Sequence, residues 1–240
     1  MFYDLHIHSA LSPCGDDTMT IYNIFNMAYI KGLDLIAITD HNSLKQQYHL
    51  EKVIQSPILQ GKINFLHGVE LQTCENIHVL AYFQRGTDLK PIQQWIDKHL
   101  IKKVNDSLYY GHQYIFDDND EIVDEEPHLL LSSLDVDVYE VVNMIHHFQG
   151  LAVLAHVFAK KYSIYAFYHD IPDNLDYDGL EVGSIKEQRE LKIRCPHARD
   201  EFVLINSDAH QLEDINEPVY QIQQAQFNQL WRKRLCRKLQ

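Results

Sequence analysis

The sequence predicts an α/β fold in which seven short strands and their connecting helices form a barrel rather than an open sheet. Two observations favour this fold. Short apolar runs recur along the 240 residues, and helical patterns follow several of them. The chain is also 45% hydrophobic and has no internal repeat or low-complexity segment, so we expect one domain over residues 1–240.

The predicted strands are apolar runs bounded by polar residues. They lie at Tyr3–His8, Leu35–Thr39, Ile63–Val69, His78–Phe83, Leu151–Ala155, Gly179–Val182 and Phe202–Asn206. Predicted helices follow some of these strands, at Thr20–Lys31, Ser43–Gln55 and Ile185–Lys192. The hydroxyl side chains of Thr20 and Ser43 favour N-caps for the first two helices.

Residues 91–147 depart from this alternation, because the segment is too long for a single crossover. It contains a predicted helix at Ile92–Asp106, an acidic segment at Phe116–Glu126 and a helix at Val138–Phe148. We expect this excursion to leave the barrel and cover the functional site, although an acidic run is more typical of a solvated loop. A basic amphipathic helix at Phe227–Gln240 is expected to pack on the barrel rather than to meet an acidic partner or a membrane.

The charge balance is acidic, with 34 Asp and Glu against 21 Lys and Arg and a formal net charge of -13. Such a surface repels a phosphate backbone, so binding of extended nucleic acid is expected to be unfavourable. No run of about 18 apolar residues is present, which argues against a membrane span. The amino terminus lacks a signal-peptide pattern and the four cysteines form no CxxC pair, so we expect a cytoplasmic protein with reduced thiols.

Histidine is frequent, with 15 residues, and several lie where predicted strands begin or end. In the first strand, alternation places Asp4, His6 and His8 on one face. Two imidazoles spaced in this way can bind one metal ion together, since histidine is the commonest metal ligand. A lone His-x-His pair is weak evidence, because two ordinary surface histidines give the same pattern.

Other predicted strands carry the same kinds of side chain at their ends. Asp40 and His41 follow the second strand, and Glu70 follows the third. The remaining residues are His78 at the start of the fourth strand, His156 after the fifth, and Asp208 and His210 after the seventh. Each has an ordinary explanation as a cap or a satisfied polar group. Together they predict a metal site at the mouth where α/β barrels place their functional groups.

These motifs resemble those of the polymerase-and-histidinol-phosphatase (PHP) family of metal-dependent phosphoesterases. The shared segments are DLHIHS at the first strand, ITDHN at Ile38–Asn42, GVE at Gly68–Glu70, HVLAY at His78–Tyr82, LAH ending at His156, and NSDAH at Asn206–His210. They occur in the family's order and span essentially the whole chain. The resemblance implies a distorted seven-stranded (βα)7 TIM-like barrel that holds two to three divalent ions.

The resemblance also implies a ligand set. His6, His8 and Asp208 would bind one ion, His41 and His210 a second, and His78 and His156 a third, with Glu70 bridging the first and third. The second ion is expected to take another ligand from the loop SALSPCGDDT, with Asp16 as our choice and Asp17 and Cys14 as alternatives. Asp40 would orient His41 or a metal-bound water. Mixed imidazole and carboxylate ligands suit Zn, Mn or Fe.

The function implied is hydrolysis of a phosphoester in a small phosphorylated metabolite or nucleotide by a metal-activated water. The expected catalytic residues are Asp40, His41, Glu70 and His210. Divalent ions lower the pKa of water and hold phosphate oxygens, so no protein nucleophile is required. Two alternatives stay open: an amidohydrolase-type enzyme cutting C–N or C–O bonds, and a non-catalytic metal-binding module. A polymerase-associated nuclease is disfavoured by the net charge.

Recognition of the phosphate is less well defined by the sequence. Many relatives continue past the Ala-His strand end with an acid and an arginine, whereas this chain reads AHVFAKKY. Lys160 or Lys161 is expected to replace the missing cation. Arg189 and Arg194 are the alternative substrate-binding residues, and the oligomeric state stays open.

Overall fold

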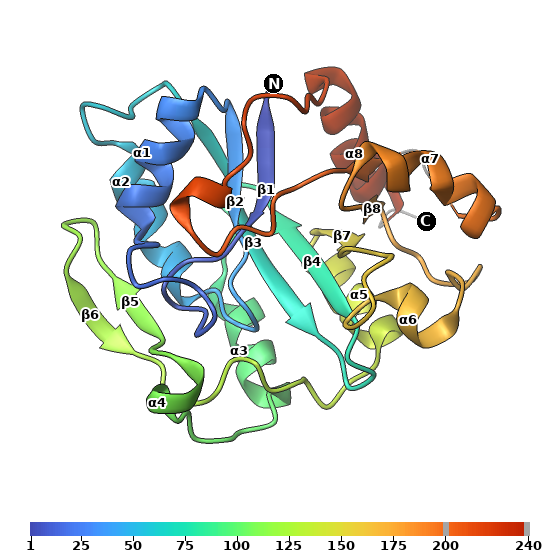
Figure 1. The fold of residues 1–240 in the computed structure, drawn as a ribbon, viewed down its shortest axis with the longest axis horizontal. Coiled ribbons are helices and arrows are strands. Elements are labelled where there is room, and N and C mark those ends of the chain that lie inside the picture. Colours follow the sequence, from blue (N-terminus) through green and yellow to red (C-terminus); the bar gives the residue numbers. More distant parts are fainter. Residues whose placement is uncertain (199–201, 238–240) are drawn as a thin grey trace.

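A computed structural model describes residues 1–198 and 202–237, with residues 233–237 described by their backbone alone. Figure 1 shows a strongly curled sheet with helices on its outer side. Its seven strands lie in the order β1-β2-β3-β4-β7-β8-β9. Their bounds are β1 Tyr3–Ile7, β2 Leu35–Ile38, β3 Asn64–Gln72, β4 His78–Phe83, β7 Leu151–Leu154, β8 Gly179–Glu181 and β9 Val203–Leu204. This arrangement confirms the predicted α/β fold with a distorted, barrel-like sheet.

The sheet is not built from parallel βα units throughout. β1, β2 and β3 are parallel, β4 is antiparallel to both β3 and β7, and β7, β8 and β9 are again parallel. Residues 73–77 join β3 to β4 and are too few for a crossover helix, so the two strands form a hairpin. The amino-terminal end of β4 therefore lies at the same edge of the sheet as the carboxyl end of β3.

The gap between β9 and β1 is bridged by the segment that follows β9. Ile7 forms a parallel bridge with Ala209, and the His8 N–H donates to the Ala209 carbonyl at 2.9 Å. The Leu5 N–H donates to Oδ1 of Asn206 at 3.0 Å. Since β9 has only 2 residues, this irregular segment rather than a long strand brings the two ends of the sheet together.

Several helices agree with their predicted positions. They are α1 (Ile21–Lys31), α5 (Val138–His147) and α7 (Ile185–Arg194), while a short α6 (Ile164–Tyr168) was not predicted. Thr20 caps α1 as expected, because its hydroxyl accepts a hydrogen bond from the Asn23 N–H at 3.2 Å.

The predicted helix at Ser43–Gln55 is wrong in its first half. A 3-10 turn at Lys45–His49 precedes a short α2 (Leu50–Ile54), and Ser43 does not cap an α-helix. The reason is a tertiary contact that the sequence does not reveal. The Gln46 side chain donates to the Phe116 carbonyl at 2.7 Å and accepts from the Phe116 N–H at 3.0 Å, which ties the 3-10 turn to the excursion.

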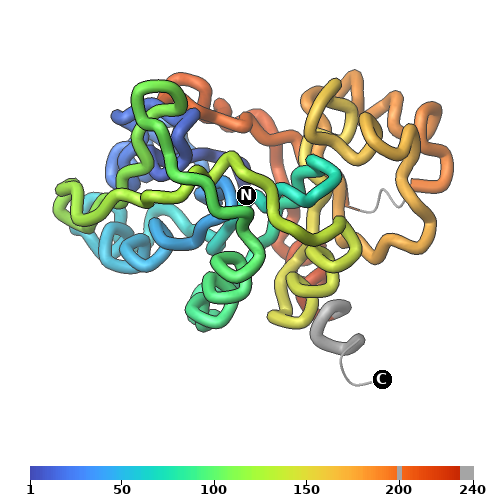
Figure 2. Tube along the Cα trace, turned by 90° about the horizontal axis from the view of Figure 1, so that it is seen from below, coloured from blue at the N-terminus to red at the C-terminus, as the bar shows by residue number. Residues whose placement is uncertain are grey.

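The excursion consists of α3 (Lys90–His99), α4 (Ser107–Tyr110) and a hairpin of β5 (Tyr114–Phe116) and β6 (Ile122–Glu125). α3 ends before the predicted Asp106, because the backbone becomes extended at Leu100. Part of the acidic segment forms the exposed strand β6 instead of a loop. Figure 2 shows the excursion in green beside the blue amino-terminal part, where the Tyr114 N–H donates to the Ala10 carbonyl at 2.9 Å.

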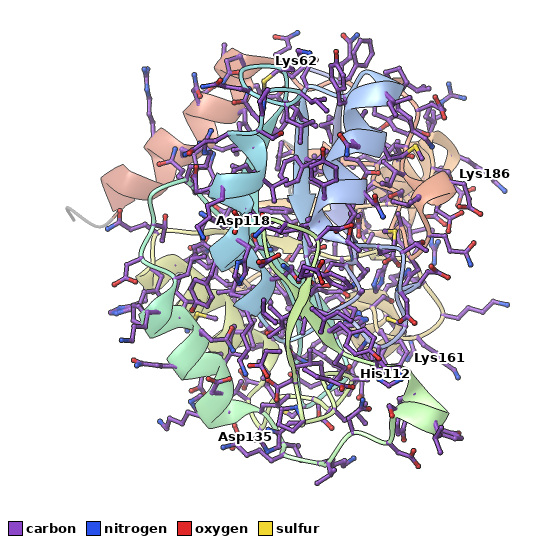
Figure 3. All side chains as sticks on the ribbon, turned by 90° about the vertical axis from the view of Figure 1, so that its left-hand side faces the viewer. Lys62, His112, Asp118, Asp135, Lys161 and Lys186 are labelled. Atoms are coloured by element: carbon purple, nitrogen blue, oxygen red, sulfur yellow. The ribbon has the colours of Figure 1, made fainter. Side chains whose placement is uncertain are left out.

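The carboxyl-terminal helix α8 (Gln224–Arg237) buries Phe227 and Trp231 in an apolar cluster with Phe202 and Leu151. Its predicted packing on the barrel is confirmed, while the side chains after Arg232 lie outside the described residues. Figure 3 shows charged side chains such as Lys62 and Lys186 projecting from the surface. Within the described ranges, the helices are all too short or too polar to cross a membrane.

Candidate metal centre

Histidine and carboxylate side chains from several strands meet at one edge of the sheet. They are His6 in β1, His8 just after it, His41 after β2, Glu70 in β3, His78 in β4, His156 after β7, and Asp208 and His210 after β9. His6, His8 and Glu70 are no more than 1% exposed. His78 is the first residue of β4 and reaches the group because that strand is antiparallel. The structure thus brings together these sequence-predicted site residues.

Glu70 lies at the centre of the group. Its carboxylate oxygens are 2.8 Å from Nδ1 of His78, 2.9 Å from Nδ1 of His41, 3.2 Å from Nε2 of His156, and 3.4 Å from Nε2 of His6 and of His8. Desolvation raises the pKa of this carboxyl, but the neighbouring imidazoles, led by His78, hold it well below its usual range. An ionised carboxylate with imidazoles near both oxygens is suited to bridge two cations.

Hydrogen bonds set the orientation of the first two imidazoles. Nδ1 of His6 lies 3.1 Å from both oxygens of Glu181, so it is the protonated nitrogen. Nδ1 of His8 lies 3.0 Å from the Ser12 hydroxyl, which donates its own hydrogen to Asp40 at 2.8 Å. With both rings neutral, the two Nε2 atoms face each other at 3.2 Å with their lone pairs, an arrangement that a shared cation stabilises.

The electrostatics of His6 also favour positive charge at this position. Desolvation lowers the pKa of His6, but Glu181, Asp208 and Glu70 raise it well above its ordinary value. By contrast, the pKa of His8 is lowered to about 3, by desolvation and then by His41. A proton or a metal ion beside His6 would be stabilised by the same three carboxylates, whereas His8 is kept neutral, as a ligand must be.

Among the described residues, three groups of donor atoms have the spacing of a metal site. They are His8, Cys14, His41 and His210; His6, His8 and Glu70; and His41, Glu70 and His78, and the atoms of each group lie within 4.8 Å of one another. In addition, Nδ1 of His156 is buried without a hydrogen-bond partner, and Nδ1 of His41 lies 2.9 Å from the Glu70 carboxylate without the alignment of a hydrogen bond. Unpaired buried nitrogens are costly, and divalent ions would satisfy them, so this donor set fits such ions.

Asp208 completes the group from the irregular segment after β9. Its Oδ1 lies 3.2 Å from Nε2 of His6 and 3.2 Å from Nε2 of His8. Its backbone φ is +54°, in the left-handed region that non-glycine residues rarely adopt. Asp4 holds this segment, because its carboxylate accepts the N–H groups of Ser207 at 3.1 Å and Asn216 at 2.9 Å. Burial raises the pKa of Asp4 to about 6.

A profile of the PHP domain matches residues 4–178. The chain belongs to the PHP family. PHP domains are metal-dependent phosphoesterases or hydrolases, and this chain has a donor set for divalent ions at the expected edge of the sheet. No curated protein sequence matches the chain.

Solved structures share this PHP fold. The endonuclease PfuEndoQ from Pyrococcus furiosus is 23% identical with a TM-score of 0.59, covering 88% of this chain and 48% of its own. A protein from Bifidobacterium adolescentis assigned as a metal-dependent phosphoesterase is 16% identical with a TM-score of 0.60, covering 98% and 96%. An amidohydrolase from Chromobacterium violaceum with bound sulfate is 16% identical with a TM-score of 0.59, covering 99% and 97%. This chain spans about half the length of the endonuclease.

The expectation that extended nucleic acid would be excluded is wrong. Endonuclease Q, 22% identical with a TM-score of 0.57, has been solved with a 27-mer duplex bearing an abasic lesion at its active site. A net charge of -13 describes the whole surface, whereas binding depends on the local field at the site. A structural neighbour with this fold therefore binds duplex DNA at its active site.

Two buried carboxylates act on the PHP centre from outside the donor groups. Asp40, expected among the catalytic residues, accepts hydrogen bonds from the Ser9 N–H and hydroxyl at 2.7 Å and from Ser12 at 2.8 Å. It positions the loop after β1 and reaches His8 only through Ser12. Glu181 was not among the predicted site residues, although it lies one residue before the end of the predicted strand Gly179–Val182 and is the last residue of β8. The same strand-end signal would have found it.

The loop after β1 places its candidate ligands differently from our expectation. Asp16 is exposed, and its carboxylate accepts hydrogen bonds from the Thr18 N–H and hydroxyl at 2.8 and 2.6 Å. Asp17 and Cys14 are also exposed, so proximity to the histidines, not burial, separates the three. Cys14, the remaining alternative, belongs to a donor group with His41 and His210. Desolvation raises the pKa of the Cys14 thiol, but hydrogen bonds with these two histidines lower it to about 7.

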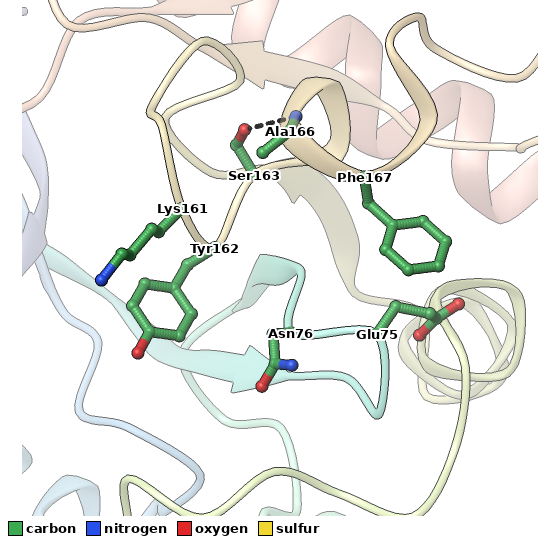
Figure 4. Close-up of a pocket in the computed structure, with 7 residues that line it drawn as sticks. All are labelled: Glu75, Asn76, Lys161, Tyr162, Ser163, Ala166 and Phe167. Carbon is green, nitrogen blue, oxygen red and sulfur yellow. Dashed lines mark hydrogen bonds between the residues drawn. The ribbon is translucent and has the colours of Figure 1, made fainter.

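A pocket of about 460 Å³ opens over the centre. Its wall includes Leu131 of the excursion, so this segment does border the site, through an apolar residue rather than through its acidic run. Tyr162 forms another part of the wall and stacks on His78 with 4.9 Å between ring centroids. Figure 4 shows Lys161 and Tyr162 at the edge of a neighbouring pocket that also contains Phe167.

The predicted phosphate-binding cations are mostly elsewhere. Lys161 lines the pocket over the centre, whereas Lys160 and Arg189 are exposed and do not line it. Arg194 stacks on the rings of Phe158 at 3.7 Å and Tyr165 at 4.5 Å, so its guanidinium is held in a packing role. Lys161 is thus the cation among these candidates that lines the pocket over the centre.

Proposed function

We propose that this chain hydrolyses a phosphoester with the help of two to three divalent ions, of Zn, Mn or Fe, held at the PHP centre. The observation that carries the proposal is the convergence of five imidazoles on the Glu70 carboxylate, at 2.8 to 3.4 Å. Such a concentration of imidazoles around one buried carboxylate is a good ligand set for divalent ions.

Each part of the cluster has a proposed role. His6, His8 and Asp208 would hold one ion, His41 and His210 a second, and His78 and His156 a third, with Glu70 between the first and third. When bound, divalent ions polarise phosphate oxygens and lower the pKa of water, which supplies the nucleophile for hydrolysis at neutral pH. Two carboxylates position the ligands. Glu181 binds His6 directly, and Asp40 reaches His8 through the Ser12 hydroxyl.

We propose Lys161 as the residue that binds the phosphate group. It lies beside the donor groups, at the rim of the pocket, where its ammonium can pair with a phosphate oxygen. The shared substrate chemistry is a phosphate ester, carried either by a small phosphorylated molecule or nucleotide or by a nucleic-acid strand. The two sources call for different assays, and both belong in the test.

The test compares chelated, dialysed protein with protein reloaded with Zn, Mn or Fe. Substrates are nitrophenyl phosphate, bis-nitrophenyl phosphate, nucleoside monophosphates, a duplex with an abasic site, and a panel of amides. We expect phosphoester hydrolysis only after reloading. Glu70→Gln should lose more than about 100-fold of this activity, which is a larger loss than substitution of a residue that only orients a ligand produces. Glu121→Gln, an exposed carboxylate on the hairpin, is the matched control.

Three outcomes would overturn the proposal. Full activity of the chelated protein would remove the role of the ions. Hydrolysis of amides without phosphoesters would favour the amidohydrolase reaction. Stoichiometric metal without turnover of any substrate would favour a non-catalytic module. For Lys161, we expect Lys161→Ala to raise KM more than it lowers kcat, with Lys160→Ala as the neighbouring control.

A further inference from the structure

Cys14 is the one cysteine with a described side chain that lies among the donor groups. Its sulfur and one nitrogen each from His8, His41 and His210 lie within 4.8 Å of one another. The other described cysteines are different: the Cys74 thiol donates to the Glu75 carboxylate at 3.6 Å, and Cys195 is buried in the apolar core. Proximity to three imidazoles is what distinguishes Cys14.

The backbone of the loop after β1 holds Cys14 in this position. The Ser12 N–H donates to the Ser9 carbonyl at 3.0 Å, and the Gly15 N–H donates to the Ser12 carbonyl at 2.8 Å. A Cβ on Gly15 would lie 2.6 Å from the Ser9 carbonyl oxygen, so only glycine allows this turn. The Asp16 N–H donates to the His210 carbonyl at 2.9 Å, which ties the loop to the segment carrying His210.

The excursion supports the same loop from outside. Gly111 has a backbone φ of +102°, and a Cβ there would lie 2.2 Å from the carbonyl oxygen of Pro13. The Tyr114 N–H donates to the Ala10 carbonyl at 2.9 Å. Cys14 therefore sits in a loop fixed on both sides, while the Asp16 carboxylate is turned outward to Thr18.

We propose that Cys14 is a thiolate ligand of the PHP centre and, together with His41 and His210, forms a position that selects zinc over manganese and magnesium. This inference rests on the metal-dependent function proposed above and deepens it. Thiolate is a soft donor that suits Zn²⁺, whereas Mn²⁺ and Mg²⁺ favour oxygen ligands, which a carboxylate at Asp16 would have supplied. Cys14 thus replaces the carboxylate that the family resemblance led us to expect.

The test uses spectroscopy of the metal-loaded full chain. With Co²⁺ in place of zinc, a sulfur-to-cobalt charge-transfer band is expected in the near ultraviolet. With zinc, X-ray absorption should show a Zn–S distance of about 2.3 Å beside Zn–N distances of about 2.0–2.1 Å. Both sulfur signals should disappear in Cys14→Ser and persist in Cys74→Ser and Asp16→Asn.

Metal selectivity gives an independent readout. Cys14→Asp is expected to bind Mn²⁺ better and Zn²⁺ at least about 10-fold more weakly than the wild type, because it exchanges a soft donor for a hard one. This variant also serves if Cys14→Ser fails to fold, since it keeps an anionic ligand at the same position. Circular dichroism and thermal unfolding check the fold of each variant.

The inference is overturned if the wild type shows no metal–sulfur signal, or if the signal survives in Cys14→Ser or Cys14→Asp. Loss of the signal in Cys74→Ser with retention in Cys14→Ser would assign the sulfur to Cys74 instead. The readouts are separate from catalysis. A protein with the zinc–sulfur signal but no hydrolysis would contradict the proposed function and support Cys14 as a ligand. Hydrolysis without the signal would support the function and contradict Cys14 as a ligand.

Discussion

Glu181 binds Nδ1 of His6 with both of its carboxylate oxygens, each at 3.1 Å. The same carboxylate also accepts hydrogen bonds from the backbone N–H of His156 at 2.9 Å and from the side-chain amide of Asn206 at 2.7 Å. One buried group thus connects the ends of β1, β7 and β9. A carboxylate behind a ligating imidazole fixes the ring and increases its basicity, so Glu181 is a determinant of the centre without being a ligand.

Glu181→Gln is expected to weaken metal binding by roughly 10–100-fold, because the amide cannot accept from His6 with both of its terminal atoms. Zinc titration with a competing chromophoric chelator measures the change. The exposed variant Glu121→Gln controls for the lost charge. Unchanged zinc affinity in Glu181→Gln would show that the His6 ring needs no such support.

Metal removal is expected to lower thermal stability, because the ions bind the folded arrangement and not the unfolded chain. At a free ion concentration of about 100 Kd, binding stabilises by about 2.7 kcal/mol, or roughly 5–10 °C in Tm for a chain of this size. Calorimetry with and without chelator checks this. In His6→Ala the difference should shrink markedly, and an equal difference in both proteins would contradict the assigned ligand set.

Gly111→Ala is expected to reduce the free energy of unfolding by roughly 1–3 kcal/mol, because its Cβ would collide with the Pro13 carbonyl oxygen at 2.2 Å. Gly86→Ala is a matched control: Gly86 also has a positive φ, of +86°, but nothing lies within 4 Å of its Cβ position. Urea unfolding of both variants separates the cost of the collision from the cost of placing alanine at a positive φ. Equal losses would show that the Pro13 contact gives way freely.

The buried imidazole of His67 is expected to make the stability of the fold depend on pH. Desolvation lowers its pKa to about 4, opposed by Glu51 and assisted by Arg85, while its value in the unfolded chain is near 6.5. Between these values the unfolded chain binds the proton and the fold does not, so stability is lost as pH falls from about 6.5 to about 4. His67→Gln should lose roughly 1–3 kcal/mol less over that range, measured by urea unfolding of the chelated proteins.

Much of the centre could be predicted because its information is local. Alternation in β1 places His6 and His8 on one face, and apolar runs followed by a polar residue mark the strand ends at His41 and His156. Parallel strands bring such ends to one edge whatever lies between them. Glu181, the last residue of β8, obeys the same rule, although it was not among the predicted residues.

Other features depend on contacts between distant segments. The antiparallel course of β4 follows from the short turn after β3, and it decides that His78 joins the centre from the start of a strand. Arg194 looked like a phosphate-binding cation, but the rings of Phe158 and Tyr165 hold it elsewhere. Net charge gave a wrong exclusion of nucleic acid, because it sums over a surface and says nothing of one site.

By itself, the sequence determined the fold class and the kinds of side chain at the strand ends, since hydrophobic periodicity and residue chemistry are properties of short segments. Only the tertiary structure shows that Cys14, rather than Asp16, lies beside His41 and His210. These residues are two positions apart in one loop, and backbone hydrogen bonds to Ser9, Ser12 and His210 determine which of them faces the histidines.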